Sequence, residues 1–199
     1  MGLTAVPPGH VAAVVTFLEM CKRPPARPLP AAQLRLARWK APAPDKYRML
    51  FRRIGERWLW FSRLVMDEAQ LTAIIHDPAV EIYAVLDPKG IEVGLIELDF
   101  RRPPDCELAF FGLIPELAGQ KLGRWMIAQV IALGWRGGIE RLWVHSCTLD
   151  HPSALGFYRA QGFEAYRREI EIFPDPRLSG HLPETAAPQI PLVPPRSRA

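Results

Sequence analysis

Cysteine is scarce in this sequence of 199 residues. The chain holds three cysteines, Cys21, Cys106 and Cys147, and no Cys-x-x-Cys pair. An odd, widely spaced set is atypical of a disulfide-stabilised secreted domain and of a zinc site built on paired cysteines. We therefore expect free thiols, a reducing environment and a cytoplasmic location.

Long hydrophobic runs are also absent. No apolar stretch approaches the ~18 residues that a membrane-spanning helix needs, although 49% of the residues are hydrophobic. The first twenty residues have no basic group ahead of their apolar run, so we expect no secretory leader. Together these features predict a globular protein without a membrane partner.

Acidic residues are rare in the first third of the chain, which makes the charge uneven. Residues 1–63 hold 12 Lys or Arg and 3 Asp or Glu, whereas residues 64–199 hold 13 and 18. A basic segment attracts anionic ligands or nucleic acid. Because no nucleic-acid motif accompanies the charge, we interpret it mainly as solvated helix faces. A nucleic-acid-associated protein is kept as an alternative.

Hydrophobic patterns predict one mixed α/β domain over residues 1–173. The strand-like segments are residues 10–18, 81–86, 92–100, 106–114, 141–149 and 163–173. The helical segments are residues 33–63, interrupted at 41–44, then 67–77, 122–136 and 151–162. Residues 174–199 contain seven prolines and lack periodicity, which indicates a Pro-rich tail, either mobile or wrapped over the domain.

Local signals fix several of these boundaries. Asp67 and Gln70 have the spacing of a capping box, and the turn at residues 87–90, Asp-Pro-Lys-Gly, predicts a hairpin. Asp150 or His151 is expected to cap the last helix, which ends at Gly162.

The segment 113–126, LIPELAGQKLGRWM, joins a strand to a helix through a glycine-containing turn. The first N–H groups of a helix have no internal partner and carry partial positive charge, so such a junction can hold an anion. Gly119 and Gly123 allow close backbone approach, and Lys121 and Arg124 add charge. The segment is neither a P-loop nor a Gly-x-Gly-x-x-Gly motif, and alone it is equally compatible with a plain turn.

A second segment, HPSALGFYRAQGF at residues 151–163, has the spacing A-x-x-x-Y-x-x-x-G-F. The two segments, separated by one strand, resemble the GNAT acetyltransferase superfamily, whose patterns are V-x-P-x-x-R-G-x-G-x-G and N-x-x-A-x-x-x-Y-x-x-x-G-F. The resemblance covers roughly residues 80–173. The chain departs from it at Ala118, where Gln or Arg is usual, at Lys121, where Gly is usual, and at His151, where Asn is usual.

This resemblance implies an α+β fold with a mixed, mostly antiparallel sheet, flanked by helices and splayed at an acetyl-CoA site. It also implies a co-substrate, acetyl-CoA, whose diphosphate lies on a backbone cradle. Leu113 and Ile114 would bind the pantetheine and the thioester carbonyl, and His151 and Ala154 would contact CoA. The cradle would comprise Ala118, Gly119, Gln120, Lys121, Leu122, Gly123 and Arg124.

Acetyl transfer to an amine needs a base, a donor for the developing oxyanion and an acid for the leaving thiolate. By resemblance, Tyr158 would protonate the thiolate and Glu107 would act as base. On a regular strand Glu107 would share a face with Ala109, Phe111 and Leu113. Glu97, His145, Asp150 and ordered water remain alternative bases.

The acceptor is expected to be a small-molecule, peptide or protein amine, bound between the early helices and the hairpin. Trp58, Trp60 and Phe61 are candidates for lining its pocket. The residue types of segment 145–151, HSCTLDH, also fit a metal site or a Cys–His nucleophile; we expect neither. A non-catalytic acyl-CoA-binding module is a second functional interpretation, and a homodimer is considered as the assembly.

Overall fold

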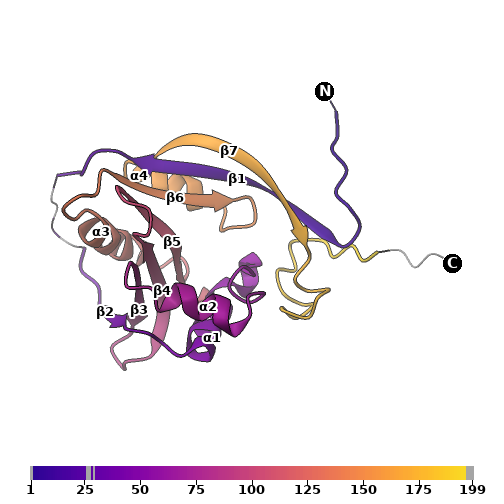
Figure 1. The fold of residues 1–199 in the computed structure, drawn as a ribbon, viewed down its shortest axis with the longest axis horizontal. Helices are drawn as coiled ribbons and strands as arrows, with labels where there is room; N and C mark the ends of the chain where they lie inside the picture. The colour runs from indigo at the N-terminus through magenta and orange to yellow at the C-terminus, as the bar shows by residue number, and fades with distance from the viewer. Residues whose placement is uncertain (1, 26–27, 29, 196–199) are drawn as a thin grey trace.

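The computed structural model describes residues 2–25, 28 and 30–195 of the chain (Figure 1). The described part contains one seven-stranded sheet with the order β2-β3-β4-β5-β6-β1-β7. Neighbouring strands are antiparallel except β5 and β6, which are parallel. This mixed sheet confirms the expected fold class. The strands are β1 (His10–Met20), β2 (Arg35–Trp39), β3 (Val80–Leu86), β4 (Glu92–Asp99), β5 (Asp105–Leu113), β6 (Arg141–Cys147) and β7 (Glu164–Pro174).

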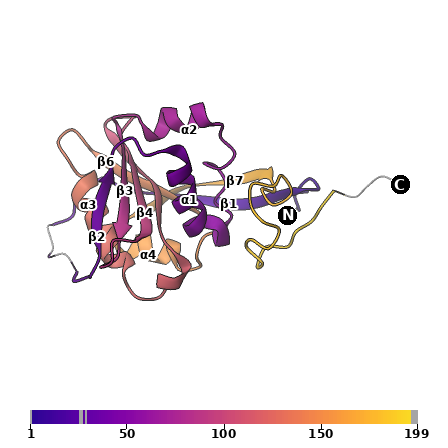
Figure 2. The ribbon, with the colours of Figure 1, turned by 90° about the horizontal axis from the view of Figure 1, so that it is seen from below.

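Helices lie on both faces of the sheet (Figures 1 and 2). Phe51 of α1 packs against Phe110 of β5, whereas Tyr158 of α4 packs against Phe111. Consecutive strand residues point to opposite faces, so α1 and α4 cover different sides. The helices are α1 (Pro44–Gly55), α2 (Glu68–Ile75), α3 (Gly123–Gly134) and α4 (Ala154–Ala160), with short 3-10 turns η1 (Glu56–Trp58) and η2 (Pro115–Leu117). Within the described ranges, no helix is long and apolar enough to cross a bilayer.

Sequence signals account for the positions of α1 and α2. Pro44 stands in the first turn of α1, where its missing N–H costs nothing. The buried face of this helix consists of Tyr47, Leu50, Phe51 and Ile54. In α2 the Asp67 carboxylate accepts from the Gln70 N–H at 2.7 Å, and the Gln70 amide oxygen accepts from the Asp67 N–H at 3.0 Å. The predicted capping box is confirmed.

The prediction that the helical region starts at residue 33 is wrong. Residues 35–39 form β2, which pairs antiparallel with β3 from Arg35 opposite Leu86 to Trp39 opposite Ile82. Pro30 and Pro42 leave too few residues between them for a stable helix. An extended chain instead satisfies the backbone groups along the open edge of β3.

The strand β1 lies between β6 and β7 and pairs antiparallel with both. Its first residues, His10–Val14, pair with β7 alone, so β1 and β7 extend beyond the rest of the sheet as a two-stranded ribbon (Figure 1). The tail packs at the far end of this ribbon. There the Arg177 guanidinium is ion-paired with Asp175 at 2.7 Å and both side chains are buried. The tail is joined to the start of β1 by backbone hydrogen bonds from Asp175 to the Gly9 carbonyl at 2.9 Å and from Gly9 to the Val193 carbonyl at 3.0 Å.

Candidate active site

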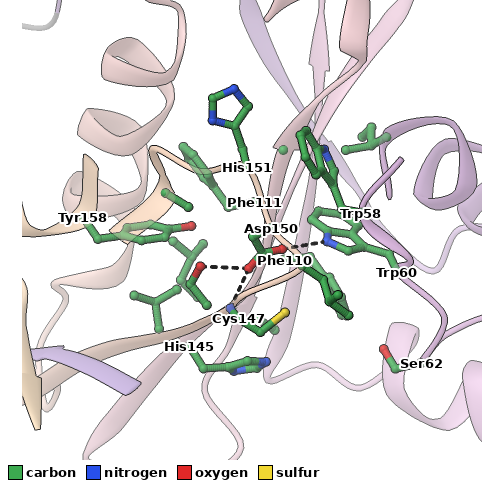
Figure 3. A pocket seen from close by; sticks show the side chains of 18 of the residues that line it. Trp58, Trp60, Ser62, Phe110, Phe111, His145, Cys147, Asp150, His151 and Tyr158 are labelled. Carbon is green, nitrogen blue, oxygen red and sulfur yellow. Dashed lines mark hydrogen bonds between the residues drawn. The ribbon is translucent and has the colours of Figure 1, made fainter. Parts of the chain in front are cut away.

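The strands β5 and β6 separate in the middle of the sheet. Their parallel pairing runs from Asp105 opposite Arg141 to Leu108 opposite Val144. Beyond that point β5 pairs with β4 only, and β6 pairs with β1 only. A cavity of ≈ 600 Å³ occupies the gap and is lined from both faces of the sheet (Figure 3). The expected splay between two strands is confirmed.

The segment after β5 forms a tight loop that ends at the first turn of α3. Gly119 has φ +79° and Lys121 has φ +61°, so the backbone is left-handed twice within three residues. Glycine adopts this conformation without strain, whereas for lysine it costs on the order of 1 kcal/mol. This accounts for the glycine usual at the position of Lys121 in the superfamily.

Five consecutive N–H groups of this loop, those of residues 119–123, donate to no other group among the residues described. The flanking N–H groups are occupied. Ala118 donates to the Pro115 carbonyl at 3.0 Å, and Arg124 donates to the Lys121 carbonyl at 3.2 Å. The available donors are thus a narrower set than the 118–124 expected from sequence.

The end of β5 supplies one free N–H rather than two. The Ile114 N–H donates to the Val93 carbonyl at 2.9 Å, and the Ile114 side chain is buried. Successive N–H groups of a strand point to opposite edges, so the Leu113 N–H points into the gap. Ile114 therefore has no free donor for a ligand, in contrast to the sequence expectation.

The other expected cofactor residues divide into two groups. Leu113, Ala118, Gly119, Gly123, His151 and Ala154 line the cavity. The side chains of Gln120, Lys121, Leu122 and Arg124 do not line it, although Lys121 and Arg124 are exposed on the loop beside it.

Tyr158 closes one wall of the cavity. Its ring packs against Phe111, Phe157 and Phe163, and its hydroxyl points into the cavity (Figure 3). Burial, with a smaller effect of Asp150, raises the pKa of Tyr158 far above its ordinary value. The phenol therefore stays protonated at neutral pH and can donate a proton or a hydrogen bond.

Glu107 lies on the opposite face of the sheet from Tyr158. Asp99 pairs with Glu107 while Glu97 pairs with Phe110, so two steps along β4 correspond to three along β5. This bulge leaves Ala109 as the extra residue and puts Glu107 and Phe110 on one face. The expectation that Glu107 shares a face with Phe111 and Leu113 is therefore wrong.

Glu107 and His145 form a pair across β5 and β6. The Glu107 Oε1 and His145 Nδ1 atoms are 3.4 Å apart, and both side chains line the cavity. The hydrogen bond to Glu107 raises the pKa of His145, against the effect of partial burial, and Asp150 and Glu171 add to the increase. The base expected from the resemblance, Glu107, and one of its alternatives, His145, thus form a single unit.

The two remaining candidate bases, Glu97 and Asp150, accept hydrogen bonds from other side chains. Glu97 is 0% exposed, accepts a hydrogen bond from Tyr47 and is ion-paired with Arg63 at 2.6 Å. Asp150 accepts from the Ser146 hydroxyl at 2.8 Å, the Cys147 N–H at 2.9 Å and the Trp60 indole N–H at 3.4 Å (Figure 3). Glu97 is thus outside the cavity, whereas Asp150 lines it with its oxygens already accepting three hydrogen bonds.

These contacts also correct the predicted cap of the last helix. The helix α4 begins at Ala154, and its N-cap residue Ser153 makes no side-chain capping bond. His151 Nδ1 instead accepts from the Ser153 N–H at 3.2 Å, and the His151 ring meets Trp58 edge-on. The Asp150 carboxylate accepts hydrogen bonds from Ser146 and Cys147 at the end of β6 and from Trp60, so it does not cap α4.

Aromatic side chains form the wall opposite Tyr158. Trp58, Trp60 and Phe61 all line the cavity, as expected for candidates, together with Phe110. Phe61 stacks on Phe173 of β7 with ring centroids 4.3 Å apart.

Sequence reasoning missed several lining residues, among them Ser62, Glu171 and Phe173. Glu171 and Phe173 belong to β7, which β1 joins to β6. The alternating pattern of residues 169–173, EIEIF, indicates two faces but cannot show which strand lies alongside.

Cys147 lines the cavity near His145 but is a poor nucleophile. Burial, aided by the negative charge of Asp150, raises the pKa of its thiol to about 11, and the thiolate is the reactive species. The arrangement therefore favours proton transfer by Glu107 and His145 over covalent catalysis by cysteine.

Comparison with known structures agrees with this geometry. An aminoglycoside acetyltransferase from an uncultured soil metagenomic sample has a TM-score of 0.55 at 16% identity, covering 71% of this chain and 95% of that protein. A mutant of the spermidine N-acetyltransferase SpeG from Vibrio cholerae has a TM-score of 0.52 at 16% identity, covering 73% and 95%. At such identities the likeness shows the fold alone.

A GCN5-related N-acetyltransferase from Sphaerobacter thermophilus has a TM-score of 0.55 at 13% identity, covering 84% of this chain. The chain spans about half, 52%, of that protein. The search of curated proteins gave no match. In sequence, residues 46–163 match the Acetyltransferase (GNAT) family, which is more than half of the chain. The protein therefore belongs to the GNAT acetyltransferase family.

Proposed function

We propose that the protein transfers the acetyl group of acetyl-CoA directly to a primary amine. The observation that carries the proposal is the single cavity through the β5–β6 gap. It joins an acid, Tyr158, on one face of the sheet to a proton-accepting pair, Glu107 and His145, on the other. A thioester in the gap would lie between them.

The free N–H groups of residues 119–123 are the donors proposed for the diphosphate. They lie at the first turn of α3, where the helix dipole favours negative charge. Lys121 and Arg124 would add charge from outside the cavity, and His151 and Ala154 would contact the cofactor from the α4 side.

The proposed reaction consists of three proton and bond changes. The Glu107–His145 pair removes a proton from the ammonium, because only a free amine has a lone pair to attack with. The amine nitrogen bonds to the thioester carbon, and the Leu113 N–H stabilises the oxygen that becomes negative. The carbon–sulfur bond then breaks and the Tyr158 hydroxyl donates its proton to the leaving thiolate. The new amide nitrogen still carries one extra proton, and this proton passes to the Tyr158 phenolate, directly or through water, which restores the phenol. The pair then releases the proton from the ammonium to solvent.

Thiol release from acetyl-CoA with a panel of amines tests this function. We expect amine-dependent release with a matching acetylated product in the mass spectrum, and much slower release for Tyr158→Phe. Tight CoA binding without release for any amine would instead identify the non-catalytic acyl-CoA-binding module.

The basic N-terminal third gives little support to nucleic-acid binding. Several of its cations are paired with carboxylates from later in the chain: Arg38 with Glu81 at 3.0 Å, Lys46 with Glu92 at 3.1 Å, and Arg63 with Glu97. Steeply salt-dependent binding to DNA or RNA would be needed to restore that function.

The acceptor amine, the oligomeric state and the cellular location are proposed separately from the reaction. Two structural neighbours are, by name, acetyltransferases of aminoglycosides and of spermidine, which makes small amines the first acceptors to test. A homodimer stays a prediction. The exposed edge strand β7, with Ile170 65% exposed, is the surface we propose for it. The cytoplasmic location likewise stays a prediction from the cysteine pattern.

A further inference from the structure

Four aromatic rings form an exposed patch on the sheet face that carries Glu107. Phe17 of β1 pairs with His145 of β6, and Trp143 lies two residues before His145 on the same face. The Phe17 ring contacts Trp143, His145 and Tyr166 at centroid distances of 5.8–6.2 Å. We call these four residues the aromatic shelf.

The shelf is open to solvent. Phe17 and Trp143 are half-buried, whereas His145 and Tyr166 are exposed, Tyr166 to 41%. A contiguous aromatic surface of this kind marks a binding site more often than a structural one. Tyr166 lies at an irregularity in the pairing of β1 with β7, which adds its ring to the same face as Phe17.

The shelf is continuous with the active-site cavity. His145 belongs to the shelf and also lines the cavity beside Glu107. The gap between β5 and β6 opens directly after Leu108 and Val144, so an amine at the Glu107–His145 pair would extend its substituent away from the cofactor and onto Trp143 and Phe17.

Charges on this face favour one cation at the cavity and, in the described part of the chain, offer no free carboxylate to a second cation on the shelf. Glu107 and Glu171 near His145 have no arginine or lysine partner among the residues described. On the shelf itself the Arg167 guanidinium lies 4.0 Å from the Phe17 ring, and that of Arg141 lies 5.7 Å from Tyr166. Both arginines are paired with carboxylates, Arg167 with Glu169 at 3.4 Å and Arg141 with Glu19 and Asp105. The second charge of a polyamine would therefore find no free carboxylate among the described residues of the shelf.

We propose that the acceptor is a monoamine whose amino group is joined by a short linker to an aromatic ring, and that Trp143, Phe17 and Tyr166 bind this ring. Stacking on aromatic side chains suits a planar ring, while the carboxylates attract the single ammonium. This inference rests on the proposed acetyl transfer and specifies its substrate class.

Matched amines test the proposal. With acetyl-CoA, we expect kcat/KM for 2-phenylethylamine and tryptamine to exceed that for n-butylamine by about 10- to 100-fold, the effect of burying one aromatic ring. Spermidine should be no better than n-butylamine. Equal values for aryl and alkyl amines, or a preference for spermidine, would overturn the proposal.

Two variants test whether the preference for aryl over alkyl amines comes from the aromatic shelf. Trp143→Leu, and separately the more exposed Tyr166→Leu, should reduce the ratio of aryl to alkyl kcat/KM at least about threefold each. Any loss that both amines share, for example through the contact of Trp143 with His145, cancels in this ratio. Trp39→Leu, a half-buried tryptophan on β2, is the control and should leave the ratio intact. An unchanged ratio in both shelf variants would contradict the assignment.

The amino group and aromatic ring could belong to a free arylalkylamine or to a peptide that begins with phenylalanine. Comparing kcat/KM for 2-phenylethylamine with that for a dipeptide amide beginning with phenylalanine distinguishes these two acceptors. A higher value for either one than for n-butylamine supports the shelf. If no amine is acetylated, the proposed function fails, and binding still tests the shelf. NMR titration of the CoA-saturated protein with 2-phenylethylamine should then show binding that Trp143→Leu weakens. No binding in the wild type would overturn the inference.

Discussion

At the residue scale, Glu107 acts through its contact with His145, whose Nδ1 atom lies 3.4 Å from the Glu107 Oε1 atom. The hydrogen bond to Glu107 raises the pKa of His145, with Asp150 and Glu171 adding to it. Below this raised pKa the His145 imidazole is protonated and cannot accept a proton. Activity should therefore rise as pH increases through it.

Glu107→Gln removes the main cause of this raised pKa. We expect the acidic limb of kcat/KM against pH to move to lower pH, and kcat/KM at its maximum to fall by about 10²-fold, the usual contribution of a general base. A limb at the same pH in both proteins would show that another base, or water, accepts the proton.

Tyr158→Phe tests the acid. The ring contacts with Phe111, Phe157 and Phe163 are kept, so the fold and CoA binding should be preserved. We expect kcat to fall by about 10²-fold and the Kd for CoA, measured by calorimetry, to change less than about twofold. Equal kcat values would remove Tyr158 from the mechanism.

At the element scale, the loop between β5 and α3 determines cofactor binding. A Cβ added at Gly123 would meet the Phe157 ring at 3.5 Å, an ordinary contact, so Gly123→Asp fits. A carboxylate there also favours the helix N-terminus, and the melting temperature should not fall. The same charge repels a diphosphate, so we expect CoA affinity to drop at least about tenfold.

Gly123→Ala is the matched control, and its affinity should change much less. Comparable CoA affinity for Gly123→Asp and the wild type would place the diphosphate away from this loop.

The sequence predicted most elements because each has a local signal: the capping box of α2, the hairpin turn at residues 87–90 and the glycine-containing turn before α3. Three features lacked such a signal. The strand β2 forms only because the edge of β3 is open, and the bulge at Ala109 appears only in the pairing of β5 with β4. The place of β1 between β6 and β7 is a long-range contact.

The same limit applies to the site. Tyr158, Glu107 and the loop were found from motifs, whereas the Glu107–His145 pair and the contacts of Asp150 with Trp60 and Ser146 depend on distant segments meeting. Local sequence patterns carry no information on contacts between residues that are far apart in the chain.

At the scale of the whole molecule, the tail ties the two chain ends together. The Asp175 N–H donates to the Gly9 carbonyl at 2.9 Å, and Arg177 donates to the Ile190 carbonyl at 2.8 Å. Burial disfavours the Asp175 charge, but the Arg177 hydrogen bonds hold the pKa of Asp175 below its ordinary value. The contribution of this ion pair to the free energy of unfolding is complete above the unfolded-state aspartate pKa of about 4. It is lost as pH falls through the lowered pKa of Asp175 in the folded protein.

Arg177→Ala would leave the Asp175 carboxylate buried and unpaired, a change that costs about 3–5 kcal/mol. The cost exceeds what a short tail gains by packing, so we expect the tail to detach while the sheet stays folded. Limited proteolysis should cleave the variant, but not the wild type, just after β7. Equal resistance of the two proteins would contradict this role.

The two parts of the sheet, β2–β5 and β6-β1-β7, meet along only the short pairing of β5 with β6. We propose that the thioester lies where that pairing ends. A crystal structure with bound CoA tests this most directly. We predict its diphosphate on the N–H groups of residues 119–123 and its thiol in the gap, near the Tyr158 hydroxyl. CoA bound elsewhere, or β5 and β6 paired along their full length, would contradict it.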